Sequence, residues 1–135
     1  MNIDEYKPAI ETVAQKYGLD FAVLFGSQAR GRIHGKSDVD IAVISRGPVD
    51  RARLAMDLAE IFKCGDTEVV NLANASPTLM HSVSRDGKLL YEKKRGAYLT
   101  WRVYAAKIWM DTEWLRRLRG RKLTEWSDAY AKAQS

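Results

Sequence analysis

Two short apolar runs joined by a polar, glycine-rich stretch constrain this fold more than any other feature of the sequence. The first, residues 21–25, is too short for an independent helix and ends at Gly26, so it predicts a buried strand. The second, residues 38–44, is rich in β-branched residues and precedes a Ser-Arg-Gly-Pro turn, so it predicts another strand. The stretch at 27–37 is then predicted to be a loop that joins the two strands.

The remaining segments predict helices and further strands around this pair. Apolar residues recur at helical spacing in five places, and two more apolar runs have the length and composition of strands. The expected helices cover 3–17, 51–62 (capped by Asp50 and ended by Gly65), 77–83, 98–118 and, after a break at Gly120, 123–133; the expected strands cover 68–72 and 88–91. We therefore expect an α/β (α+β) chain that ends in a pair of helices.

Length and composition fit one compact domain with an anionic partner. The chain has 135 residues, of which 46% are hydrophobic, and its net charge of +5 favours a nucleotide, a nucleic acid or an acidic protein face without choosing among them. The single cysteine, Cys64, excludes an internal disulfide framework and a cysteine-based zinc site. The N-terminus lacks a signal-peptide pattern and no apolar run approaches the ~18 residues that span a bilayer, so we expect a cytoplasmic protein without a membrane anchor.

The polar residues at the ends of the two predicted strands carry the chemistry. Ten residues, 28–37, separate the pair Gly26-Ser27 from Asp38-Val39-Asp40. Strand side chains alternate, so Asp38 and Asp40 project from the same face, where a shared Mg²⁺ offsets their repulsion. Gly26 lets a phosphate approach the backbone, and Ser27 offers its hydroxyl and N–H groups to that phosphate. This arrangement is typical of two-metal phosphoryl or nucleotidyl transfer.

A third carboxylate usually completes such a site, and the next predicted strand offers two candidates. Glu68 lies within the apolar run, where a charged side chain needs a reason, whereas Asp66 follows Gly65 and is explained as a turn residue. We therefore favour Glu68. The competing interpretation is that Glu68 simply occupies the exposed face of an edge strand.

The run Phe25-Gly26-Ser27-Gln28-Ala29-Arg30-Gly31, continued by Ser37-Asp38-Val39-Asp40-Ile41, resembles the signature of the DNA polymerase β-like nucleotidyltransferase superfamily. Within it, the run looks like the minimal nucleotidyltransferase (MNT) branch. Segments 68–72 and 85–91 are similar to later strands of that branch, so the resemblance covers roughly residues 8 to 95.

This resemblance implies a polymerase-β-like nucleotidyltransferase fold with a central mixed β-sheet flanked by helices, ATP as the donor, Mg²⁺ as the cofactor and transfer of AMP to a hydroxyl. Many such proteins are antitoxins of an all-helical HEPN ribonuclease toxin, and the acceptor is then a tyrosine of that toxin. Carried over to this sequence, Asp38, Asp40 and Glu68 are the catalytic and metal-binding residues, and the nucleotide-binding residues are Gly26, Ser27, Arg30 and Ser37. Arg30 fits equally well a second role, bracing the loop against an acidic side chain. The third carboxylate is usually aspartate, so Glu68 departs from the family pattern by one methylene.

The C-terminal segment suggests a partner surface. We expect residues 1–95 to form the nucleotidyltransferase core and residues 96–135 to form a helical extension that packs on the core or on a partner, within a single domain overall. Large apolar groups fall on two faces of the predicted 98–118 helix, Trp101 and Ile108 on one and Met110 and Trp114 near another, which exceeds what docking on one small sheet requires. The basic residues at 116–122 are explained as a solvated helix end, with RNA or triphosphate binding as the alternative.

The expected function is antitoxin activity through AMP transfer to a protein tyrosine, and two alternatives stay open. A small hydroxylated molecule, such as an aminoglycoside, is a possible acceptor for the same chemistry, although little chain remains here for a second substrate domain. In the second alternative, the chain is an antitoxin that neutralises its toxin by binding alone, and its nucleotide site is vestigial. Direct binding of nucleic acid is not favoured.

Overall fold

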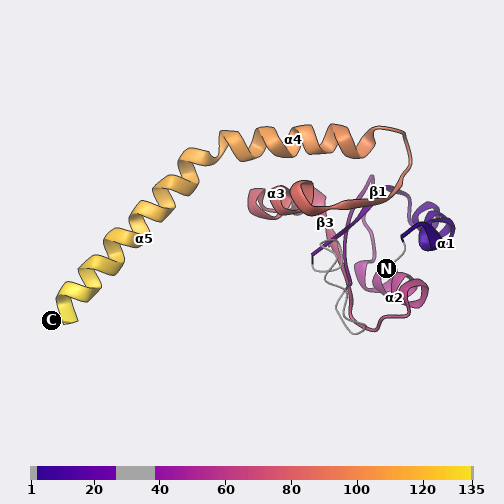
Figure 1. Cartoon of the computed structure of the whole chain (residues 1–135), viewed down its shortest axis with the longest axis horizontal. Helices are drawn as coiled ribbons and strands as arrows, with labels where there is room; N and C mark the ends of the chain where they lie inside the picture. Colours follow the sequence, from indigo (N-terminus) through magenta and orange to yellow (C-terminus); the bar gives the residue numbers. More distant parts are fainter. Residues whose placement is uncertain (1–2, 27–38, 135) are drawn as a thin grey trace.

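The computed structural model describes residues 3–26 and 39–134, which form a four-stranded sheet with helices on both faces and a long C-terminal helix (Figure 1). In chain order the elements are α1 (Ile3–Lys16), β1 (Leu19–Phe25), β2 (Val39–Ser45), α2 (Arg51–Phe62), β3 (Thr67–Asn71), a 3-10 helix η1 (Leu72–Asn74), α3 (Pro77–Asp86), β4 (Lys88–Glu92), α4 (Ala97–Asp111) and α5 (Glu113–Gln134).

The sheet is mixed, which confirms the expected architecture. Its strand order is β3-β2-β1-β4. β1 pairs antiparallel with both β2 and β4, whereas β2 and β3 pair in parallel. A parallel pair needs a crossover, and α2 supplies it between β2 and β3. This topology brings the end of β1 and the starts of β2 and β3 together at one end of the sheet.

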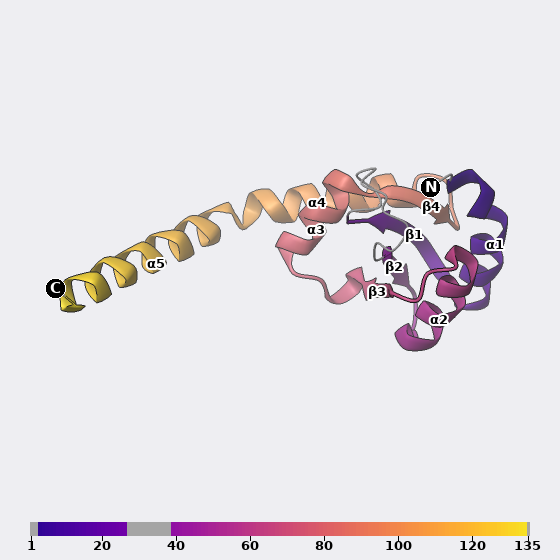
Figure 2. The same cartoon turned by 60° about the horizontal axis from the view of Figure 1, so that its bottom comes forward.

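The two faces of the sheet are covered by different pairs of helices (Figure 2). Leu24, Ile41 and Val43 point into a core formed with α1 and α2. Phe21, Val23 and Ala42 alternate with them and point into a second core formed with α3 and α4. All six side chains are at most 2% exposed, so both faces of β1 and β2 are buried. Such strands read as continuous apolar runs, which is the pattern found in the sequence.

The predicted bounds of α2 and its Asp50 cap are confirmed, but the residue that ends the helix is Lys63 and not Gly65. The Asp50 carboxylate accepts a hydrogen bond of 3.2 Å from the backbone N–H of Arg53. The last helical residue is Phe62, and the C-cap Lys63 adopts the left-handed conformation with φ +54°. The N–H of Cys64 then donates to the carbonyl of Ala59. Lysine fills the role that glycine usually has at this position, so Gly65 lies beyond the end of the helix.

Several other element boundaries differ from the prediction by up to three residues. The predicted strand at 68–72 ends one residue earlier, because the Asn71 side chain accepts a hydrogen bond from the N–H of Ala73 and starts a 3-10 turn at Leu72. The helix expected at 77–83 continues to Asp86. Its cap is Ser76, whose hydroxyl accepts from the N–H of Leu79 at 3.2 Å.

The C-terminal segment contains two helices, but the predicted break at Gly120 is wrong, since the chain turns at Thr112 and Gly120 lies inside α5. The Thr112 hydroxyl donates to the carbonyl of Ile108 at 2.7 Å, and the Arg116 guanidinium donates to the carbonyl of Trp109 at 2.6 Å. These side chains satisfy the last carbonyls of α4, whereas a glycine inside an exposed helix costs only about 1 kcal/mol.

Three stacked side chains hold this turn against the body of the protein. The His81 ring of α3 lies parallel to the Trp109 ring of α4, with centroids 3.9 Å apart, and the Arg116 guanidinium of α5 lies 3.3 Å from the Trp109 ring. Beyond this stack α5 extends away from the sheet (Figure 1), and nearly all of its described side chains are exposed. Within residues 3–26 and 39–134, no helix has both the length and the apolar character needed to cross a membrane.

Candidate active site

Gly26 and Asp40 are in direct contact at the edge where β1 ends and β2 begins. Gly26 follows the last residue of β1 and has φ +80°, a conformation that L side chains rarely adopt. A Cβ atom at this position would lie 2.5 Å from Oδ2 of Asp40. Glycine is therefore required twice, once for the backbone conformation and once for the space that the carboxylate occupies.

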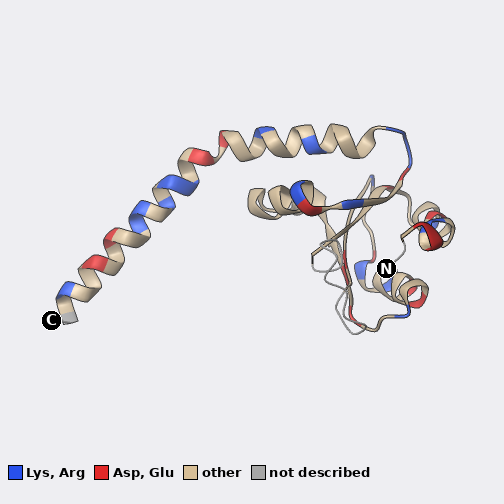
Figure 3. Ribbon diagram, in the orientation of Figure 1, with Lys and Arg blue, Asp and Glu red and all other residues tan. Residues whose placement is uncertain are grey.

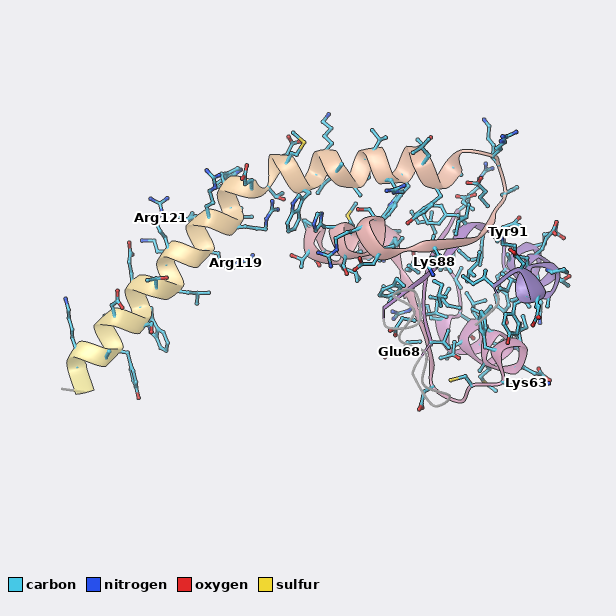
Figure 4. The ribbon with its side chains drawn as sticks, viewed as in Figure 1. Lys63, Glu68, Lys88, Tyr91, Arg119 and Arg121 are labelled. Atoms are coloured by element: carbon cyan, nitrogen blue, oxygen red, sulfur yellow. The ribbon has the colours of Figure 1, made fainter. Side chains whose placement is uncertain are left out.

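Glu68, which is labelled in Figure 4, is paired with Asp40 of the neighbouring strand. The register pairs Phe25 with Asp40 across β1 and β2, and Asp40 with Glu68 across β2 and β3. Residues paired in this way have Cα atoms about 5 Å apart and side chains on the same face. Asp40 is half-buried and Glu68 is exposed. The two carboxylates therefore lie on the same face of the sheet, at the end where β2 and β3 begin.

The carboxylate pair is suited to a hard divalent cation. Carboxylate oxygens are the ligands that Mg²⁺ prefers, and it commonly binds through one or two carboxylates while phosphates or water complete its shell. Among the described residues no group of three His, Cys, Asp or Glu side chains is close enough to hold a metal ion. Asp40 and Glu68 thus supply part of a ligand set, and the sequence offers Asp38 as the further member.

Four of the predicted site residues, Ser27, Arg30, Ser37 and Asp38, lie outside the described residues. Their assignments stay predictions. Asp66 is described, and its role here is a backbone one, since its carbonyl accepts a hydrogen bond of 2.9 Å from the N–H of Val39. This bond joins the segment before β3 to the start of β2, next to the paired carboxylates. The exposed Asp66 side chain is not needed for it.

Sequence reasoning missed a second glycine that positions β1. A Cβ atom at Gly87 would lie 2.5 Å from both the Val23 Cγ1 atom and the Val83 carbonyl oxygen. The Tyr98 hydroxyl donates to that same carbonyl at 3.2 Å, and burial raises the pKa of Tyr98. Gly87 thus lets the turn between α3 and β4 press against the middle of β1. The only sequence signal was its position in an Asp-Gly pair, which reads as an ordinary turn.

Resolved pKa shifts elsewhere belong to structural contacts. Asp57 of α2 accepts a hydrogen bond of 2.6 Å from the Tyr17 hydroxyl and another of 3.1 Å from Lys16, and these bonds lower the pKa of Asp57. The same bond to Asp57 raises the pKa of Tyr17. Both groups belong to the α1–α2 side of the protein, away from the face that carries Asp40 and Glu68.

Residues 8–96 match the family model described as Polymerase beta, Nucleotidyltransferase. This match covers β1, β2 and β3, which carry Gly26, Asp40 and Glu68. The chain belongs to the polymerase β nucleotidyltransferase family. The fold expected from the sequence resemblance is therefore the fold of this family.

Relatives within the polymerase β nucleotidyltransferase family point to its minimal nucleotidyltransferase branch. The chain is 38% identical over 87 residues to the protein adenylyltransferase MntA of Aphanizomenon flos-aquae, a match that covers 56% of this chain and 58% of the relative. It is also 38% identical over 76 residues to the protein adenylyltransferase MntA of Shewanella oneidensis, covering 54% of each. The chain thus spans little more than half the length of these curated relatives.

Superpositions on solved structures cover a larger fraction of this chain than the two sequence alignments do. A chain of a toxin–antitoxin structure with AMP-PNP superimposes with a TM-score of 0.76 at 26% identity, covering 87% of this chain and 98% of the other. An MNT antitoxin structure from Shewanella oneidensis, in complex with a tri-AMPylated HEPN toxin, gives a TM-score of 0.72 at 23% identity and covers 90% and 98%. The second comparison shows a shared fold.

Proposed function

We propose that this chain is a Mg²⁺-dependent nucleotidyltransferase that transfers AMP from ATP to a protein hydroxyl, and that it acts as the antitoxin of a HEPN-type toxin. The observation that carries the proposal is the contact between Gly26 and Asp40 with Glu68 in register on the next strand. The two relatives named as protein adenylyltransferases and the similar structure solved with AMP-PNP support the reaction and the donor. The acceptor, a tyrosine of the toxin, rests on the sequence resemblance.

The residues present fit the proposed cofactor and nucleotide. Asp40 and Glu68 would hold Mg²⁺ together with Asp38, and the ion supplies positive charge for the phosphate oxygens and lowers the pKa of an attacking hydroxyl. Gly26 has no side chain, so a phosphate can approach its backbone beside Asp40. Ser27, Arg30 and Ser37 are proposed to hold the rest of the triphosphate.

The chemical step needs one proton acceptor and one leaving group. We assign Glu68 as the base, because it is exposed at this end of the sheet while Asp40 is half-buried against Gly26. The acceptor O–H gives its proton to the Glu68 carboxylate, and the oxygen forms a bond to the α-phosphorus of ATP. The bond between that phosphorus and the α,β-bridging oxygen breaks, and pyrophosphate leaves with that oxygen. The extra methylene of Glu68 moves its carboxylate outward, toward a large acceptor such as a protein.

The C-terminal helices are proposed to hold the toxin. Leu99, Val103 and Met110 are 62%, 65% and 72% exposed and lie on the face of α4 opposite the buried Trp101 and Ala105. The exposed apolar side chains of α5 extend this surface: Trp114, Leu123, Trp126 and Tyr130. The likeness to the toxin–antitoxin structure covers 87% of this chain, so it continues beyond residue 96 into these helices. A protein partner is the occupant that this surface favours.

The test of the reaction is label transfer from α-³²P-ATP to a co-expressed HEPN-type partner. Asp40→Asn and Glu68→Gln should each abolish labelling, while Glu60→Gln, which changes an exposed carboxylate on α2, should leave it intact. Labelling that survives both active-site changes would refute the assignment. Partner binding with no labelling of any kind by the wild-type chain would instead establish an antitoxin that acts by binding alone.

A matched pair of methionines tests the partner surface. Met110 on α4 and Met56 on α2 are 72% and 71% exposed. Met110→Glu should weaken capture of the HEPN-type partner, whereas Met56→Glu should not. Equal capture by both variants would place the partner elsewhere. If label instead passes to an aminoglycoside and not to the partner, the small-molecule alternative replaces the antitoxin proposal.

A further inference from the structure

A second site lies at the opposite end of the sheet from Asp40 and Glu68. A cleft of about 820 Å³ opens beneath the start of α4. Its lining comes from the start of β1, the end of β2, the segment before α4 and the first two turns of α4. Phe25 at the candidate active site is four positions further along β1 than Phe21 in this cleft, which corresponds to about 13 Å along the strand. The two sites are therefore separate.

The floor of the cleft is made of packed aromatic rings. Phe21 and Trp101 are 2% and 7% exposed, and their ring centroids lie 5.7 Å apart. Both also pack on Tyr98, at 5.3 Å and 6.0 Å. Phe21 is tilted by 56° and 57° against the other two rings, and all three are at most 7% exposed, so they do not form an open platform for stacked bases. They form an apolar floor on which an aliphatic or aromatic side chain can rest.

The rim of the cleft is strongly cationic. Arg46, Lys93, Lys94 and Arg95 all line it, and among the described residues Asp20 is the one acidic side chain in the lining. Asp20 is engaged by Arg46, with Oδ1 and Nε 3.5 Å apart. In the described part of the chain, no carboxylate lies within ion-pair distance of Lys93, Lys94 or Arg95. Figure 3 shows these cations on the segment that leads into α4.

The helix N-terminus beside the rim already has its own anion. The Glu92 carboxylate accepts hydrogen bonds of 3.2 Å from the backbone N–H groups of Gly96 and Tyr98, the cap and an early residue of α4. A bound ligand would therefore be recognised by the Lys and Arg side chains rather than by the helix end. Three exposed cations beside an apolar floor match a ligand with several carboxylates around one apolar group.

We propose that this cleft binds an acidic peptide segment that carries one large apolar side chain. The apolar side chain enters between Ile44 and Trp101 toward Phe21, and neighbouring carboxylates pair with Lys93, Lys94 and Arg95. The inference goes beyond the proposed function, because it requires neither a nucleotide nor the active-site carboxylates. Single-stranded RNA is the competing ligand of the same charge, and the ring packing in the floor argues against it.

The test titrates the ¹⁵N-labelled full chain with a short synthetic peptide in which one leucine is flanked on each side by three glutamates. Two comparison peptides replace the leucine with glycine or the glutamates with glutamine, and an oligouridylate provides the RNA probe. We expect the acidic leucine peptide to bind best and to shift the amide signals of Gly96, Ala97 and Thr100. Stronger binding of oligouridylate at these amides, or no binding of the peptide, would overturn the proposal.

Variants locate the binding within the cleft. Lys93→Glu/Arg95→Glu should raise the peptide Kd about tenfold, since two attractive rim contacts become repulsive. Arg119→Glu/Arg121→Glu, the same charge change on α5, should leave the Kd unchanged. Thr100→Trp should fill the cleft and weaken binding without a change in charge. If the α5 variant loses as much affinity as the rim variant, the attraction is a property of net charge and the cleft is not the site. No ATP is present, so this result is independent of nucleotidyl transfer.

Discussion

Replacing Gly26 with alanine tests the geometry on which the candidate active site depends. The added methyl group would lie 2.5 Å from Oδ2 of Asp40, whereas ordinary contacts begin near 3.4 Å. The carboxylate must therefore move by about 1 Å, a displacement that can cost a catalytic site about 100-fold in rate. The positive φ of Gly26 adds about 1–2 kcal/mol of backbone strain.

Gly18 provides the matched control for this change. Its φ is +66°, but a Cβ atom there would meet nothing within 4 Å. Gly18→Ala and Gly26→Ala should thus lower the free energy of unfolding by similar amounts, measured by urea denaturation, while only Gly26→Ala lowers the rate of AMP transfer by about 100-fold. A Gly26→Ala variant with the wild-type rate would refute the claim that this glycine makes room for Asp40.

Three further predictions concern stability and helix boundaries. Trp101→Ala should lower the free energy of unfolding by about 3–5 kcal/mol, because this ring is buried on Phe21. Trp126→Ala on the exposed α5 should change it by less than about 0.5 kcal/mol. Equal effects of the two variants in urea denaturation would contradict the packing described. The folded state lowers the pKa of Asp57, so the stabilisation from this carboxylate is present above its unfolded pKa and is lost as pH falls through its folded pKa. Between about pH 5 and pH 2 the wild type should therefore lose more free energy of unfolding than Asp57→Asn. Parallel curves of stability against pH for the two proteins would exclude the effect. Gly120→Ala should increase the helical signal of α5 in circular dichroism, since Gly120 lies inside this helix with space for a methyl group; a decrease would restore the break that the sequence predicts there.

Local patterns in the sequence predicted the fold well where one element decides its own structure. The runs at 21–25 and 38–44 became β1 and β2, and Asp50 capped α2, because strand burial and helix capping depend on neighbouring residues. The turn at Thr112 was missed because it depends on the Arg116 side chain reaching back to Trp109, seven residues earlier. Helical periodicity does not record such a contact, whereas a glycine nearby is an obvious but misleading signal.

The candidate site was predictable in its residues but not in its arrangement. The spacing of Gly26 and Asp40, and the charged Glu68 within an apolar strand, were visible in the sequence. The register that sets Phe25 opposite Asp40, and Asp40 opposite Glu68, depends on which strands pair and in which direction. The cleft beneath α4 was not predictable, because its lining comes from segments between Asp20 and Tyr104 that meet only after the sheet has formed.

The stack of His81, Trp109 and Arg116 lies at the base of α5, whose other described side chains are nearly all exposed. A helix of 22 residues is about 33 Å long, so a tilt of about 10° at Thr112 would shift its far end by about 6 Å. The rings near the pivot would move by far less than the Trp126 and Tyr130 side chains near the tip. A small change of angle at Thr112 would therefore be amplified at the far end of α5, away from the sheet that carries Asp40 and Glu68.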